Sequence, residues 1–302
     1  MVEFKYPYGS VWISYTSLSD LKKCRRLYIL KIRKVKNLKT QIVNPYVTLG
    51  EVVHETLNII SKLPKADRFS KPLEPEFLRL WDNFHAIKGG FESEEQEKEF
   101  KERGLRMIAT VSENPGVLQN PAIRITESDG LPPNYLLSDK ESLVLCGNID
   151  WIEVLPDGSL HVIDFKTGNN EDKDILQLQL YMLLLSNKSK RKVKRISFWY
   201  LNKYNEPKEV PLPEMEGFEE FLVEKGREMK MLRSQKEVFC AKGGCKYCRE
   251  YEAIFDGRAE YVGIDPIMHK SCFYLKPGSE NEVFKDETNA DLNDPYSEDL
   301  PF

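Results

Sequence analysis

The first part of the chain places apolar side chains at helical intervals. Residues 16–37 combine this spacing with many basic side chains, which predicts a basic amphipathic helix with its apolar face at Leu18, Leu21, Leu27 and Leu30. Ser17 and Asp20 have the spacing of a capping box at its start. Further helices are predicted over 50–63, 76–85 and 94–111.

The pattern changes after Pro121, where β-branched and apolar residues become frequent. Strands are predicted over 122–128, 141–155 and 159–167, and the sequence PDGS at 156–159 predicts a hairpin turn. A helix over 173–186, a strand over 194–204 and a helix over 214–235 follow. This order predicts an α/β fold, with a mixed central sheet flanked by helices and a helical region at the N-terminus.

Composition and charge narrow the class of protein. The chain has 302 residues, 41% hydrophobic and 30% charged, with no apolar run long enough to cross a membrane and no secretory signal, so a soluble protein is expected. The net charge is −4, of which residues 280–302 carry −7, leaving +3 elsewhere. Between Leu21 and Gly50 there are nine Lys or Arg and no acid. We expect a cytoplasmic location, in a bacterial or phage-infected cell.

Two opposite charges end the apolar strand at 159–167. Asp164 and Lys166 are two residues apart, so their side chains lie on one face, and Asp150 on the preceding hairpin strand is expected to lie across from them. Two carboxylates that close repel unless a proton or a cation lies between them. A divalent metal satisfies this requirement, and a lysine beside it can orient water and offset charge on phosphorus.

The motifs around this pair occur in a recognisable order. GEVVH (50–54), GNID (147–150), DFK (164–166) and QLQLY (177–181) together resemble the PD-(D/E)XK nuclease superfamily. The resemblance is to its RecB-type branch, which includes AddB-type nuclease domains and CRISPR adaptation exonucleases, and it covers about residues 14–235. It implies a restriction-endonuclease-like core that hydrolyses phosphodiester bonds with a metal-activated water, using Mg²⁺ or Mn²⁺.

The resemblance also implies roles for individual residues. His54, Asp150 and Asp164 would hold the metal together with the backbone carbonyl of Phe165, and Lys166 would act on the water. Gln177 and Tyr181 would brace the site and the scissile phosphate, although Tyr181 also fits a purely core position. Glu127 stands where the family often has another acid.

The cysteines offer two ligand sets. Branch members often carry an iron-sulfur cluster, which here would use Cys24, Cys240, Cys245 and Cys248, although this spacing departs from the family pattern. The second set is Cys245, Cys248, His269 and Cys272, whose C-x2-C-x20-H-x2-C spacing is typical of structural zinc and resembles LIM and treble-clef modules. We favour zinc, with a hairpin over 253–263 between the ligand pairs, and assign Cys146 to the core.

The remaining features concern partners. The basic residues of 22–39 and 188–195 are expected to track phosphates, which favours single-stranded DNA or DNA ends as substrate. The last six residues, SEDLPF, resemble the acidic tip with which bacterial single-stranded-DNA-binding proteins recruit repair enzymes. That tip would bring replication or repair proteins to this chain.

Together these features predict three parts. They are a nuclease domain over 1–238 with a helical insertion at about 62–118, a metal-binding module over 239–278, and a disordered acidic tail over 279–302. The predicted function is a metal-dependent DNA exonuclease in recombination, repair or phage DNA processing. The alternative is a DNA-binding scaffold that recruits partners through the module and the tail.

Overall fold

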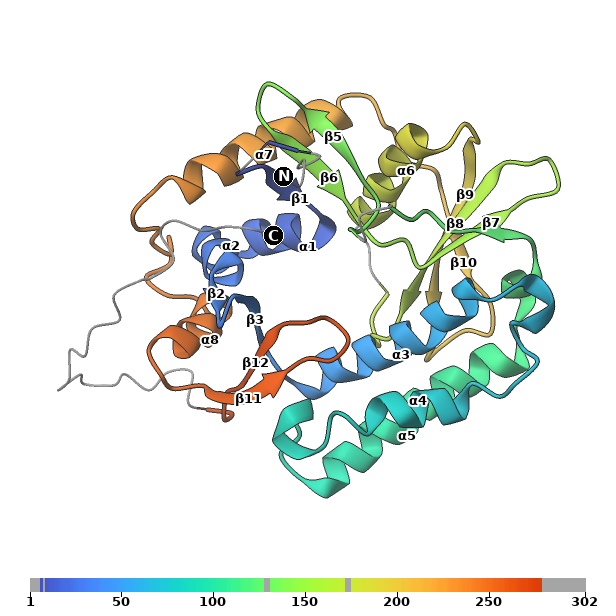
Figure 1. Ribbon diagram of the computed structural model, residues 1–302, viewed down its shortest axis with the longest axis horizontal. Helices are drawn as coiled ribbons and strands as arrows, with labels where there is room; N and C mark the ends of the chain where they lie inside the picture. Colours follow the sequence, from blue (N-terminus) through green and yellow to red (C-terminus); the bar gives the residue numbers. More distant parts are fainter. Residues whose placement is uncertain (1–5, 8, 128–130, 172–174, 279–302) are drawn as a thin grey trace, which may run out of the picture.

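The computed structural model describes residues 6–7, 9–127, 131–171 and 175–278 (Figure 1). The strands in this part of the chain form three mixed sheets, with helices packed around them. The predicted α/β class is therefore confirmed. Among the described residues, no helix combines the length and apolar character needed to cross a membrane.

A five-stranded sheet carries the predicted charged strand end. Its order is β10 (Lys208–Val210), β9 (Val193–Tyr200), β8 (Leu160–Lys166), β7 (Trp151–Val154) and β4 (Ala122–Ile123). The predicted hairpin is present, since β7 and β8 pair antiparallel, whereas β8 and β9 pair parallel through the helix between them. The strand predicted over 122–128 is shorter, because only β4 pairs with β7.

Helices cover both faces of this sheet. On one face lie α3 (Pro45–Lys62), α4 (Glu74–Trp81) and α5 (Glu94–Glu113), whose side chains form one core with Trp151, Phe165 and Trp199. On the other face α6 (Leu176–Lys188) packs on Val162 and Phe198. Alternation along β8 therefore sends Phe165 to the α3 side, and Asp164 and Lys166 to the other side.

A three-stranded sheet extends the core. It consists of β1 (Val11–Ile13), β6 (Leu143–Cys146) and β5 (Asn134–Ser138), covered by α1 (Tyr15–Lys23), α6 and α7 (Phe218–Arg233). The predicted basic helix is in fact two helices, α1 and α2 (Arg25–Ile32), because Cys24 between them has extended backbone with φ −168°. The N-cap is Ser14, bonded to Ser17, in place of the predicted Ser17 and Asp20 pair.

The C-terminal elements pack against the N-terminal ones. A third sheet has the order β11 (Glu260–Ile264), β12 (Ser271–Tyr274), β3 (Leu38–Ile42) and β2 (Lys34–Val35), and β12 pairs parallel with β3. Helix α8 (Lys246–Phe255) lies beside α2 (Figure 1). The residues after the predicted boundary near residue 239 are therefore in close contact with β3 and α2 of the predicted nuclease domain. The predicted hairpin over 253–263 is wrong, because α8 continues to Phe255 and the hairpin is β11–β12.

Candidate active site and cysteine cluster

The end of β8 brings the predicted charge pair together. Lys166 Nζ lies 2.9 Å from Asp164 Oδ2, and the Asp164 side chain is only 1% exposed. Asp164 is held within the sheet, because β8 pairs with strands on both sides. Lys166 is the last residue of β8 and remains partly exposed. A buried carboxylate thus lies beside an ammonium at the strand end.

Asp150 connects this strand end to α3. It directly precedes β7, and its Oδ2 accepts a hydrogen bond of 2.8 Å from the Phe165 backbone N–H. Its Oδ1 lies 3.2 Å from His54 Nδ1, and His54 comes from the middle of α3. The histidine, although 96 residues away in sequence, therefore reaches the same site as the carboxylates.

The first turns of α6 complete the cluster. Gln177 accepts a 2.7 Å hydrogen bond from Lys166 Nζ through its Oε1, and its Nε2 donates to Asp164 Oδ1 at 2.6 Å. The same amide nitrogen lies 2.8 Å from the Tyr181 hydroxyl one turn later. Tyr181 packs closely against Gly147, where a Cβ atom would lie 3.2 Å from its ring. The glutamine amide is therefore fixed between both members of the charge pair.

The site raises the pKa of three of its members, for different reasons. Burial and the nearby Asp150 carboxylate raise the pKa of Asp164 to about 6, although Lys166 and His54 favour its charged form. Burial alone would lower the pKa of His54, but the Asp150 carboxylate outweighs it and raises the pKa to about 9. Burial raises the pKa of Tyr181 well above its ordinary value. Burial is therefore the main cause of the raised Asp164 pKa, and repulsion from the Asp150 carboxylate adds to it.

The donor atoms fit a hard divalent cation. Asp164 Oδ2 is buried and receives no aligned hydrogen bond from any described residue, although Lys166 is near. His54 uses Nδ1 toward Asp150, and its Nε2 makes no hydrogen bond within the described part of the chain. Carboxylate oxygens and an imidazole nitrogen suit Mg²⁺ or Mn²⁺. His54, Asp150 and Asp164 supply these donor types and stay the predicted ligands, although among the described residues only the cysteines form a group of three or more donors within 4.8 Å of one another.

A cavity of about 870 Å³ opens onto this cluster. Its walls include His54, Asp150, Phe165 and Gln177, and one face of α3 runs along it. Glu127 also lines the cavity, but its Oε1 lies 2.5 Å from Lys188 Nζ at the far end of α6. Glu127 therefore does not join the Asp150 and Asp164 pair in this structure.

The predicted basic segments are largely engaged within the fold. Cationic groups from α2, β2 and their neighbours lie over aromatic rings of the C-terminal elements, in the pairs Lys23–Tyr247, Lys31–Tyr251, Arg33–Phe255 and Lys36–Tyr261. Arg26 pairs with Glu252. In the second segment, Lys188, Lys194 and Arg195 pair with carboxylates. None of these residues lines the cavity, but Lys23, Arg33, Lys36 and Lys194 remain exposed, so the two phosphate tracks stay a prediction.

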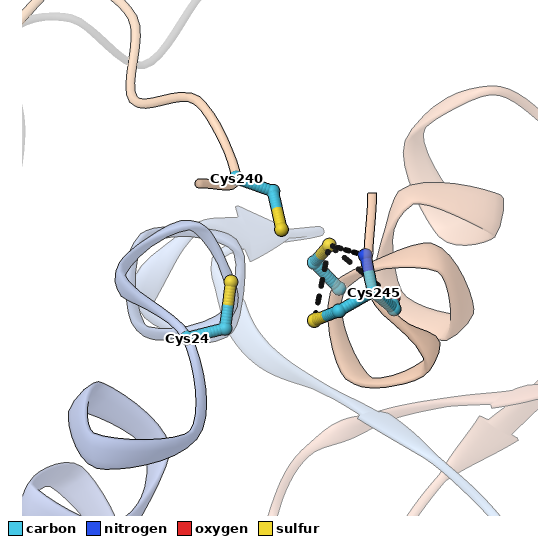
Figure 2. A group of neighbouring side chains, drawn as sticks. Cys24, Cys240 and Cys245 are labelled. Atoms are coloured by element: carbon cyan, nitrogen blue, oxygen red, sulfur yellow. Dashed lines mark hydrogen bonds between the residues drawn. The ribbon is translucent and has the colours of Figure 1, made fainter. Parts of the chain in front are cut away.

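A second cluster consists of four cysteines. The Sγ atoms of Cys24, Cys240, Cys245 and Cys248 all lie within 4.8 Å of one another. The Sγ atoms of Cys245 and Cys248 are 3.6 Å apart. Figure 2 shows the sulfur atoms of Cys24, Cys240 and Cys245 turned toward one another from three separate segments. This is the set that we considered with iron-sulfur clusters.

Local backbone geometry explains how these cysteines meet. Cys24 is the extended residue between α1 and α2, whereas Cys245 is the N-cap of α8 and Cys248 lies in its first turn. Gly243 and Gly244 have φ of +64° and +107°, values that L side chains rarely adopt, and the resulting turn returns the chain from Cys240 to Cys245. The GG pair within C-x4-C was the sequence signal for this turn.

The favoured zinc set is not assembled. Within the described residues, neither His269 nor Cys272 belongs to any group of three possible ligands at metal-binding distance. The reason is α8, which holds Cys245 and Cys248 at its start and extends about 15 Å before the hairpin that carries the other two begins. Cys272 is instead buried in β12 beside β3. The predicted SEDLPF tip lies outside the described residues.

Comparison with known families agrees with this geometry. A family model described as the PD-(D/E)XK nuclease superfamily matches residues 12–254. The matched range includes all four motif segments and all four cysteines of the cluster. A comparison with curated proteins gives no match. Since the family model covers most of the chain, the chain belongs to the PD-(D/E)XK nuclease superfamily.

Proposed function

We propose that this chain is a divalent-metal-dependent deoxyribonuclease of the RecB-type branch, acting as an exonuclease on single strands or DNA ends. One observation carries the proposal. Beside a cavity, His54 contacts Asp150, and Asp164, Lys166 and Gln177 contact one another. The Phe165 backbone N–H, which bonds to Asp150, joins the two groups. A scaffold that only binds DNA has no need of such a set, which argues against the adaptor alternative.

The residues divide the work of hydrolysis. A divalent cation, when bound, would acidify water and offset charge on the phosphate. His54, Asp150 and Asp164 would hold it, and the carbonyl of Phe165 remains a predicted fourth ligand. Lys166 has its ammonium anchored by Asp164 and Gln177, so it can orient the attacking water and stabilise negative charge on phosphorus. Because the pKa of His54 is raised to about 9, this residue must release a proton before it can ligate a metal.

Two substitutions test the site. Asp164→Asn and Lys166→Ala should each abolish cleavage of end-labelled DNA in Mg²⁺ or Mn²⁺ while DNA binding persists. Asp157→Asn is the matched control, because Asp157 is an exposed carboxylate in the turn of the same hairpin. Cleavage that survives in Asp164→Asn would contradict the site. Circular single-stranded DNA should resist the enzyme, whereas its degradation would replace the exonuclease proposal with an endonuclease.

The cysteine cluster is proposed to hold a structural zinc ion. Zn–S bonds of about 2.3 Å in a tetrahedron place ligand sulfurs about 3.8 Å apart. The four sulfurs here, within 4.8 Å of one another, fit that size. A cluster of several iron and sulfide ions between them would require wider separation. The cysteines come from the start of α2, from the segment between α7 and α8, and from the start of α8. A metal there would fasten the C-terminal elements to the N-terminal helices.

A further inference from the structure

Tyr46 presents an exposed aromatic ring inside the active-site cavity. It lies in the first turn of α3, is 66% exposed and lines the same cavity as His54. Isolated exposed apolar residues are common on protein surfaces. The surroundings of this ring, however, distinguish it from a surface side chain without a role.

The Tyr46 ring is held in a fixed position. It contacts Phe100 edge to face, with 5.0 Å between ring centroids and 86° between planes. The Arg103 guanidinium lies 5.9 Å from both rings and donates 2.6 Å to the Thr167 carbonyl, next to Lys166. Asn44 caps the helix by accepting from the Tyr46 backbone N–H at 3.1 Å. The ring is thus preorganised and tied to the catalytic strand end.

The spacing along α3 places this ring beside the reaction centre. Tyr46 and His54 are eight residues apart, which corresponds to about 12 Å along the helix axis. A group that contacts Tyr46 therefore belongs to a nucleotide neighbouring the scissile phosphate. A ring with an exposed face suits stacking with a nucleobase, because every base has an aromatic face.

A free cation lies on the wall of the same cavity. Arg124, which follows β4, lines the cavity and is exposed. It makes no hydrogen bond or ion pair with any residue in the described ranges, in contrast to the paired cations of the two basic segments. An aromatic platform and an unpaired guanidinium in one cavity match the base and the phosphate of a single strand.

We propose that Tyr46 stacks on an unpaired base next to the scissile phosphate while Arg124 binds a backbone phosphate, so that the strand in the cavity is single-stranded. In a duplex the faces of a base are covered by its neighbours, and Tyr46 has no face to contact. This inference rests on the proposed nuclease function and specifies its substrate.

An abasic scan tests the stacking directly. The affinity for single-stranded oligonucleotides that lack one base, at successive positions, is measured for two proteins. Both carry Asp164→Asn to prevent cleavage, and one has the wild-type Tyr46 whereas the other has Tyr46→Ala. Removal of the base at one position should weaken binding by roughly ten-fold or more when Tyr46 is present. The same removal should have little effect in Tyr46→Ala, because the ring that stacks on this base is already missing. Tyr46→Phe should behave as wild type. Phe221 is an exposed aromatic residue on α7, and Phe221→Ala should show the same position-dependent loss of binding as wild type.

The outcomes separate the two proposals. An identical scan for wild type and Tyr46→Ala would overturn the stacking site, even if wild-type cleavage is normal. Absence of wild-type DNA cleavage would overturn the nuclease proposal, while the binding scan would still report on Tyr46. Arg124→Gln should weaken binding at all positions equally and reduce the salt dependence by about one counterion. An unchanged salt dependence would remove Arg124 from the site.

Discussion

Lys166 at the end of β8 donates a 2.7 Å hydrogen bond to Gln177 in the first turn of α6. The ammonium would otherwise be free to rotate about its flexible stem. The glutamine also donates to Asp164, so one side chain of α6 positions both members of the charge pair. Packing of α6 on the sheet therefore sets the geometry of the predicted catalytic lysine.

Removal of this bridge should slow cleavage without preventing DNA binding. In Gln177→Ala both hydrogen bonds are lost, and we expect a decrease in the single-turnover rate of roughly 10- to 100-fold, as for partners that orient metal ligands. Gln179→Ala is the control, because Gln179 is on the same helix and donates elsewhere, to the Glu214 carbonyl. Equal rates for Gln177→Ala and wild type would show that Lys166 needs no such anchor.

Metal content should follow the four-cysteine set. Cys24→Ser and Cys240→Ser should lose bound zinc and melt at lower temperature, because these thiolates would fasten separate segments. His269→Ala and Cys146→Ser should keep the metal, since neither residue belongs to the cluster. The measurement is elemental analysis with thermal denaturation. A brown protein with broad visible absorption would identify an iron-sulfur cluster at the same cysteines.

Glu51 should make stability depend on pH. Burial and the adjacent Asp265 carboxylate raise its pKa from 4.5 to about 8. A carboxyl whose pKa is raised by folding stabilises the protein fully below its unfolded pKa, and this contribution is lost as the pH rises through its folded value. Stability should therefore fall between about pH 4.5 and 8.

The variant Glu51→Gln should flatten that part of the curve. The amide can still bond to Gln41, which donates to Glu51 at 2.8 Å, but it does not titrate. Thermal midpoints measured from pH 5 to 9 without added divalent metal should differ little at low pH and favour the variant at high pH. Parallel curves for the two proteins would exclude Glu51 as the group responsible.

Lys31 should matter for stability more than for DNA affinity. Its ammonium lies 2.9 Å from the buried Asp20 carboxylate and over the Tyr251 ring of α8. Lys31→Ala leaves Asp20 unpaired, so we expect a loss of about 2 kcal/mol in the free energy of unfolding, reduced from a fully buried pair by partial exposure. Urea denaturation measures it, and a matched titration with single-stranded DNA should show nearly wild-type affinity. A large loss of affinity for single-stranded DNA would instead indicate that residues 22–39 bind phosphates.

The element order and the segments of the candidate site were readable from the sequence. Apolar alternation and the PDGS turn predicted the β7–β8 hairpin, and helical spacing predicted α3 and α6. Asp164 and Lys166 are two residues apart on one strand, a relationship that strand geometry fixes locally. Their meeting with His54 followed from the family resemblance, since nothing local relates residue 54 to residue 150.

Only the tertiary structure decided which distant groups meet. Cys245 and Cys248 fit two ligand sets by spacing, and the choice depends on α8, whose length carries His269 and Cys272 away while its start faces Cys24. The basic residues near Lys31 have the charge of a phosphate track, but Lys31 lies over an aromatic ring more than 200 residues later and pairs with Asp20. Spacing and periodicity record contacts within one element, whereas contacts between elements depend on packing, which the local sequence does not encode.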